Sequence, residues 1–88
     1  MLKIVSLESH DRSLILYLEG RVMGPWVAEL RRSCDAALTV GSALTLDLGG
    51  VSFIDGEGIA LFRSLAGQRV ALENCSPFVS EQLRGVLR

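Results

Sequence analysis

The residues best placed to do chemistry lie in one short stretch, IDGEGI, which begins at Ile54. Asp55 and Glu57 are carboxylates with one residue between them, and Gly56 and Gly58 free the backbone around them. Two acids can work as general acid and base when they face each other across a cleft with separated pKa values. They can also sit at a helix start, where free N–H groups stabilise negative charge. This second role is simpler, so we expect Asp55 to be an N-cap and Glu57 to favour the same helix end.

Other enzyme chemistry finds little support in the chain. The sequence contains no HExxH, GxSxG or GxxxxGK[ST] pattern, and its single histidine, His10, lies in the turn-like stretch SHDR. Cys34 and Cys75 have no CxxC spacing, so we expect two buried thiols and neither a metal site nor a disulfide. We therefore expect no catalytic residues and no cofactor. Glycines at 49, 50, 56 and 58 give only a weak signal for nucleotide binding.

Size and composition fit one small domain spanning residues 1–88. Apolar residues make up 49% of the chain and charged residues 22%, as in a compact fold. The formal net charge of −1 argues against a nucleic-acid partner, which would need a basic surface. No apolar run of about 18 residues or secretion signal is present, so we expect a cytoplasmic protein that does not insert into a membrane.

The elements that must position the acidic stretch follow from apolar periodicity and from glycine and proline. Strands are predicted over residues 2–8, 13–20, 43–48 and 69–74, with the first two forming a hairpin. Helices are predicted over residues 25–40 and 57–66 and from residue 77 onward. This order, β-β-α-β-α-β-α, predicts an α/β domain with a mixed four-stranded sheet and helices packed on it.

Helix ends and faces can also be predicted. Pro25 suits a first helical turn, Gly41 suits a C-terminal cap, and Ser76 followed by Pro77 suits the start of the last helix. On the middle helix, one broad face should belong to the core: Ile59, Leu61, Phe62, Leu65 and Ala66. The opposite face should point outward: Glu57, Ala60, Arg63 and Ser64. With the loop at Asp55, Gly56, Glu57 and Gly58, the outward side chains Ala60, Arg63 and Ser64 form the best predicted interaction surface.

The stretch GGVSFIDGEGIALF resembles the signature of the STAS domain family, whose type members are bacterial anti-sigma factor antagonists. In that signature a strand ends in aspartate and leucine, and a short apolar step leads to Asp-Ser-Ser-Gly and a helix. The positions that match in type and spacing are Asp47, Leu48, Val51, Phe53, Ile54, Asp55, Gly58, Ile59, Leu61 and Phe62. The resemblance implies a STAS-like fold over nearly the whole chain.

The chain departs from the family at the position of the switch. In family members that act as switches, a partner kinase phosphorylates the first serine of Asp-Ser-Ser-Gly, and the added charge releases the partner. Gly56 stands there in this chain and has no hydroxyl, while Glu57 replaces the second serine. We expect no phosphorylation at Gly56. Another serine could accept the phosphate in its place, and Ser52 fits the loop position better than Ser64. We nevertheless favour an ordinary turn role for Ser52, because most loop serines stabilise turns.

Two further departures concern the partner surface and the sheet edge. Residues 20–23 read GRVM where the family often has glycine, glutamate, leucine and aspartate, so Arg21 and Met23 replace two acids. Many relatives also carry another strand after the last helix. Its absence here predicts an exposed sheet edge that would allow a homodimer.

The resemblance predicts a non-catalytic protein-interaction module. The leading hypothesis is a bacterial signalling protein of transcription regulation, an anti-anti-sigma factor that binds an anti-sigma factor or a serine kinase-like protein. The alternative is the small STAS subunit of a lipid-transport ABC complex, which braces the transporter ATPase, because FIDGEGIAL resembles that subfamily too.

Overall fold

Seven elements form the chain in the predicted order, β-β-α-β-α-β-α. The computed structural model describes residues 1–9 and 11–86. Its strands are β1 (Leu2–Glu8), β2 (Ser13–Val22), β3 (Ala43–Ile54) and β4 (Val70–Glu73). Its helices are α1 (Pro25–Thr39), α2 (Gly56–Leu65) and α3 (Pro77–Gln82). The expected α/β class is confirmed.

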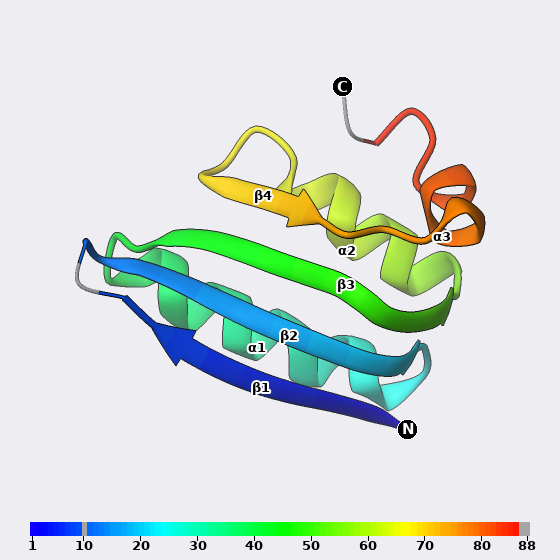
Figure 1. Cartoon of the computed structure of the whole chain (residues 1–88), viewed down its shortest axis with the longest axis horizontal. Coiled ribbons are helices and arrows are strands. Elements are labelled where there is room, and N and C mark those ends of the chain that lie inside the picture. Colours follow the sequence, from blue (N-terminus) through cyan, green and yellow to red (C-terminus); the bar gives the residue numbers. More distant parts are fainter. Residues whose placement is uncertain (10, 87–88) are drawn as a thin grey trace.

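The four strands make one mixed sheet in the order β1-β2-β3-β4 (Figure 1). β1 pairs antiparallel with β2, whereas β2 with β3 and β3 with β4 are parallel pairs. Each parallel pair is joined through a helix, α1 for the first and α2 for the second. In Figure 1, α1 and α2 lie behind the sheet and α3 closes the end at which β3 stops. β1 and β4 are the sheet edges, and the predicted homodimer stays a prediction.

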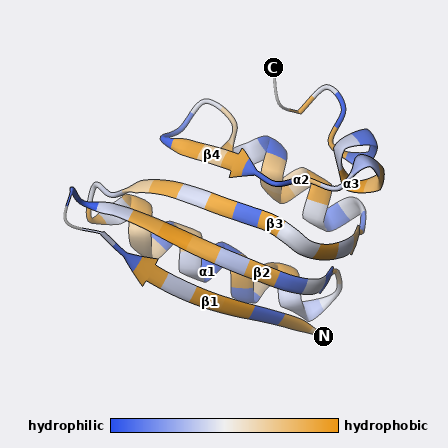
Figure 2. Ribbon diagram, viewed as in Figure 1, coloured by the Kyte–Doolittle hydropathy of each residue, from blue (hydrophilic) through white to orange (hydrophobic). Residues whose placement is uncertain are grey.

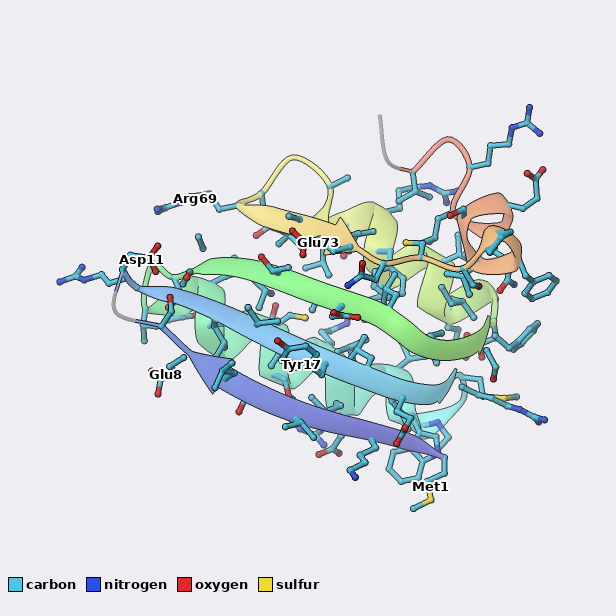
Figure 3. The ribbon with its side chains drawn as sticks, viewed as in Figure 1. Met1, Glu8, Asp11, Tyr17, Arg69 and Glu73 are labelled. Atoms are coloured by element: carbon cyan, nitrogen blue, oxygen red, sulfur yellow. The ribbon has the colours of Figure 1, made fainter. Side chains whose placement is uncertain are left out.

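Buried and exposed side chains alternate along the strands, so one face of the sheet is covered by the helices and the other is not. Leu16, Leu18 and Val22 of β2 are buried, while Tyr17 and Glu19 between them are exposed. Figure 3 shows Tyr17 on the sheet face turned toward the viewer, away from α1. The covered face and the helices form one core: Leu2, Leu16, Leu18, Val22, Val27, Leu30, Cys34, Ala37, Leu44, Leu46, Leu48, Val51, Ile54, Leu61, Phe62, Leu65, Val79, Leu83 and Val86.

The uncovered face carries apolar side chains that the sequence did not single out. Val5 is 47% exposed, Leu7 54% and Tyr17 41%. Cross-strand register places Val5 opposite Tyr17 and Leu7 opposite Ile15. Figure 2 shows that β1 and β2 are rich in apolar residues overall. This face therefore carries an apolar patch of Val5, Leu7 and Tyr17 that no described helix covers.

β3 continues beyond its predicted end. The strand was predicted over residues 43–48, yet β3 runs to Ile54. At Gly50 a Cβ atom would lie 2.9 Å from the carbonyl oxygen of Leu18 on β2. Glycine there allows close approach of neighbouring backbones and does not end the strand.

The helix ends largely follow the predictions. Gly41 has φ 83°, and the amides of Gly41 and Ser42 donate to the carbonyls of Leu38 and Ala37, which is a Schellman cap. Ser76 Oγ accepts a hydrogen bond of 3.2 Å from the amide of Val79 at the start of α3. α3 itself ends at Gln82, so the predicted helical residues Leu83 and Val86 are buried beyond its end.

Candidate functional site

The acidic stretch forms a sharp corner between a strand and a helix, as predicted. β3 ends at Ile54, Asp55 is extended with φ −85° and ψ −179°, and α2 begins at Gly56. The amide of Asp55 donates a 3.0 Å hydrogen bond to the carbonyl of Val22 at the end of β2. We call residues 54–56 the corner.

The carboxylate of Asp55 joins the starts of two helices. Its Oδ1 accepts a 2.8 Å hydrogen bond from the amide of Gly58 in α2. Its Oδ2 accepts a 3.0 Å hydrogen bond from the amide of Gly24, the N-cap residue of α1. These two amides, Gly24 first and then Gly58, hold the pKa of the Asp55 carboxyl below its ordinary value of 3.8. The predicted N-cap role is confirmed, and the second bond, to α1, was not foreseen.

Removing this carboxylate should weaken both helix starts. Loss of a capping side chain costs about 0.5–2 kcal/mol, so Asp55→Ala should lower the free energy of unfolding by about 1.5 kcal/mol at pH 7. Asp55→Asn should cost less, because its amide oxygen can still accept one of the two hydrogen bonds. Urea unfolding of the three proteins at pH 7 measures both differences.

The same experiment has a pH dependence with a defined sign. Because the folded pKa of Asp55 lies below 3.8, its contribution is fully present above that pH and is lost as the pH falls through the folded pKa. The stability gap between wild type and Asp55→Ala should therefore shrink in strong acid. A gap that stays constant would contradict the capping role.

Gln82 of α3 secures the other side of the corner. Its Oε1 accepts a 3.0 Å hydrogen bond from the amide of Ile54, and its Nε2 donates a 2.7 Å hydrogen bond to the carbonyl of Ile54. β4 pairs with β3 only from Leu44 to Asp47, so it cannot reach this position. One side chain thus replaces a strand partner at the end of β3. A polar residue in a short helix gave no sequence signal for this role.

The two glycines on either side of Glu57 have different surroundings. Gly56 is exposed, and a Cβ atom there would have nothing within 4 Å. Gly58 is buried, and a Cβ atom there would lie 2.7 Å from Ile54 Cγ2 and 3.0 Å from the Val22 carbonyl oxygen. Although we placed both in the partner-binding loop, only Gly56 is open to a partner, because Gly58 packs against β2 and β3.

The outward face of α2 is close to the one predicted. Glu57, Ala60, Arg63 and Ser64 are all exposed, whereas Leu61, Phe62 and Leu65 are buried. Ile59 is only half-buried and Ala66 is exposed, although both were expected in the core. Ala66 leaves the helical projection because it is the C-cap, with φ −63° and ψ 137°. Together with Gly56, the four exposed residues Glu57, Ala60, Arg63 and Ser64 make up what we call the α2 face.

The remaining sequence candidates lie beside the corner. Ser52 is exposed, and its Oγ donates a 3.4 Å hydrogen bond to the carbonyl of Gly20, in keeping with a structural serine. Arg21 pairs in register with Phe53, and both lie on the uncovered face of the sheet, between buried neighbours such as Val22 and Ile54. Arg21, Ser52 and Phe53 thus lie together beside the corner, because β2 and β3 are paired there.

The thiols behave differently from each other. Cys34 is fully buried, and burial raises the pKa of its thiol to about 12. Cys75 is only half-buried, contrary to expectation, and burial still raises the pKa of its thiol. Within residues 1–9 and 11–86 no group of three or more His, Cys, Asp or Glu side chains could hold a metal ion. His10 lies outside the described residues.

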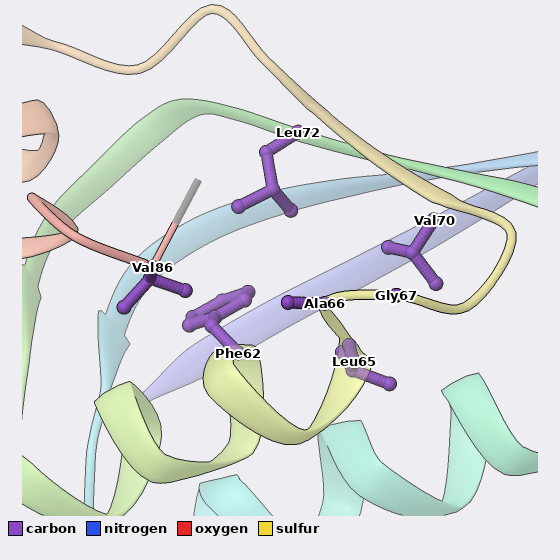
Figure 4. A pocket seen from close by; sticks show the side chains of 7 residues that line it. All are labelled: Phe62, Leu65, Ala66, Gly67, Val70, Leu72 and Val86. Carbon is purple, nitrogen blue, oxygen red and sulfur yellow. The ribbon is translucent and has the colours of Figure 1, made fainter. Parts of the chain in front are cut away.

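A separate hollow lies at the far end of α2 (Figure 4). It has a volume of about 300 Å³ and is lined by apolar side chains and Gly67: Phe62, Leu65, Ala66, Gly67, Val70, Leu72 and Val86. Because no lining side chain is polar or titratable, this hollow offers no acid, base or metal ligand.

The helices of the described segments include none that is both long and apolar enough to cross a membrane.

Comparison with known proteins agrees with this geometry. A family model described as "Mlab, STAS domain" matches residues 5–86. No curated protein matches the chain. Among solved structures, a similar one is an uncharacterized protein of the DUF3478 family with a SpoIIAA-like fold, from Shewanella loihica PV-4. It has a TM-score of 0.61 and 13% sequence identity, and the match covers 94% of this chain and 74% of that chain.

The structural likeness shows a shared fold, and the family model spans nearly all of β1 to α3. Both agree with the signature in which β3, the Asp55 corner and α2 follow one another. The chain therefore belongs to the STAS domain family.

Proposed function

We propose that the chain is a non-catalytic module that binds another protein through the corner and the α2 face. The observation that carries this proposal is the exposure of Glu57, Ala60, Arg63 and Ser64 beside a corner held by both Asp55 and Gln82. A surface on rigid elements loses little conformational freedom when it binds. The small side chain of Ala60 lets a partner approach α2 closely.

Two features support a non-catalytic role. STAS domains are generally non-enzymatic, and the Asp55 carboxylate already accepts two backbone hydrogen bonds. Because those bonds hold its pKa low, Asp55 suits neither a general acid nor a base near neutral pH. Their positions at the start of α2 explain Asp55 and Glu57 better than acid–base catalysis does.

For the partner, we propose an anti-sigma factor or a related serine kinase-like protein in the bacterial cytoplasm. The resemblance to anti-sigma factor antagonists supports this choice, as does the SpoIIAA-like fold of the similar structure. Binding would lack the usual phosphorylation switch, because Gly56 has no hydroxyl and is exposed where the family has serine. The partner would then be bound constitutively or be controlled elsewhere.

A second candidate is the small STAS subunit of a lipid-transport ABC complex, which would brace the ATPase. Two observations favour it: the stretch FIDGEGIAL resembles that subfamily, and the matching family model carries the description Mlab. Gly56 is compatible with this candidate as well, because a bracing subunit needs no phosphorylation site. Affinity purification from native cells, followed by mass spectrometry, separates the candidates by the class of partner recovered.

The surface itself can be tested with one substitution on α2. Ala60→Arg should reduce partner binding about tenfold, equivalent to about 1.4 kcal/mol, because a long charged side chain would hold the two surfaces apart. Ala36→Arg provides a matched control, since Ala36 is an exposed alanine on α1. Partner affinity measured by biolayer interferometry should fall for the first variant alone, with thermal unfolding unchanged for both. Equal affinities would exclude the α2 face as the binding surface.

A further inference from the structure

An open groove lies next to the corner, on the face of the sheet that the helices leave uncovered. It has a volume of about 360 Å³ and is lined by Arg21, Met23, Ser52 and Phe53. Arg21 and Phe53 are register partners on the parallel strands β2 and β3, so their side chains stand next to each other. We call this the Arg21 groove. It lies within three residues of Asp55 along β3 and within one residue of Gly24 beyond β2.

The groove combines one positive charge with an apolar lining. Among the described residues, ion pairs join only Glu29 to Arg32 and Glu81 to Arg84, so the guanidinium of Arg21 has no carboxylate partner there. Phe53 and Met23 are half-buried and supply apolar surface. The hydroxyl of Ser52 donates a long bond of 3.4 Å to the Gly20 carbonyl, and it can donate to a closer acceptor.

These features define the chemistry of an occupant. A carboxylate suits a guanidinium best, because the two form charge-assisted hydrogen bonds that can be bidentate. An apolar side chain next to that carboxylate would cover Phe53 and Met23. A purely apolar segment would leave Arg21 desolvated without compensation, and a basic segment would be repelled.

We propose that the Arg21 groove receives an acidic side chain and a neighbouring apolar side chain from the protein partner. The inference rests on the proposed function, because it extends the same docking surface from the α2 face across the corner to β2. Arg21 would then select the partner by charge, while Phe53 and Met23 provide apolar contact. Arg21 and Met23 are the two positions at which this chain lacks the acids that the family often has there.

A peptide selection tests the chemistry with a defined probe. A phage-displayed library of random peptides is selected on the immobilised full chain, and the strongest binders are synthesised. The selected peptides should contain aspartate or glutamate next to leucine, isoleucine, phenylalanine or methionine. Amide chemical shifts in NMR spectra should change around Arg21 and Phe53 when such a peptide is added. A selection that yields no acidic, apolar peptide overturns the proposal.

Charge reversal provides the decisive comparison. Arg21→Glu should weaken the selected peptide about tenfold or more, whereas Arg21→Lys should weaken it less. Replacing the acid of the peptide with lysine should restore binding to Arg21→Glu. Arg69→Glu is the matched control, because Arg69 is exposed beside the start of β3, at the other end of the sheet from the corner (Figure 3). Unchanged affinity of Arg21→Glu, or failure of the charge swap, overturns the proposal.

The same variants separate this inference from the proposed function. If Ala60→Arg reduces binding of the native partner but Arg21→Glu does not, the α2 face stands and the Arg21 groove is excluded. If neither variant changes the binding of that partner, the proposed surface itself is wrong.

Discussion

Replacing Gln82 with methionine is expected to lower the free energy of unfolding by about 2–3 kcal/mol. Methionine has nearly the same length, so the packing of α3 is kept while both hydrogen bonds to Ile54 are lost. Ile54 is 1% exposed, and an unpaired buried polar group costs about 1–3 kcal/mol. Chemical unfolding followed by circular dichroism measures the difference from wild type.

Two further variants sharpen this test. Gln68→Met removes one hydrogen bond from an exposed glutamine to the Ser64 carbonyl, so it should cost at most about 0.5–1 kcal/mol. Gln82→Glu keeps an acceptor for the Ile54 amide but loses the donor to the Ile54 carbonyl. Its deficit should shrink below pH 4, because a protonated carboxyl regains a donor; the ordinary glutamate pKa is about 4.3. A Gln82→Met protein as stable as Gln68→Met would show that Ile54 needs no side-chain partner.

The second large effect concerns the glycine that packs the start of α2. Gly58→Ala should lower the free energy of unfolding by about 1–3 kcal/mol, as expected for overpacking. The new methyl group would lie 2.7 Å from Ile54 Cγ2 and 3.0 Å from the carbonyl oxygen of Val22. A backbone oxygen and a buried β-branched side chain can move little, so α2 would have to shift away from Asp55.

Gly56→Ala is the matched control for this prediction. It makes the same chemical change two residues earlier, where nothing lies within 4 Å of the new methyl group. Alanine also restricts the unfolded chain, so Gly56→Ala should be neutral or stabilising by up to about 1 kcal/mol. Thermal unfolding of the two variants should therefore move in opposite directions or differ clearly in size. Equal midpoints would contradict the close packing of Gly58.

Much of the fold could be predicted because its signals are local. Period-2 apolar patterns located the strands, and Pro25, Gly41 and Ser76 marked helix ends that the structure confirms. The strand-to-helix corner at Asp55 was predicted from one aspartate and two glycines. Each of these signals depends on residues close together in the chain, so it can be recognised from the sequence alone.

The errors arose where distant segments meet. The predicted strand ended at residue 48, although Gly50 continues it by packing closely against the Leu18 carbonyl of another strand. Gln82 received no prediction because its partner, Ile54, lies 28 positions away. Gly58 looked like loop flexibility, although its role is to fit against Val22 and Ile54. Tertiary packing decides each of these cases.

The shared capping by Asp55 has a mechanical consequence. Its two oxygens hold the amides of Gly24 and Gly58, which belong to different helices and lie 34 positions apart in the chain. If a partner displaces the first turn of α2 outward, one of these two hydrogen bonds must therefore lengthen, or the first turn of α1 must move with it. The amide proton of Gly24 would then exchange with solvent faster, even though nothing touches α1. The exchange rate of the Gly24 amide proton therefore reports displacement of α2 at the corner.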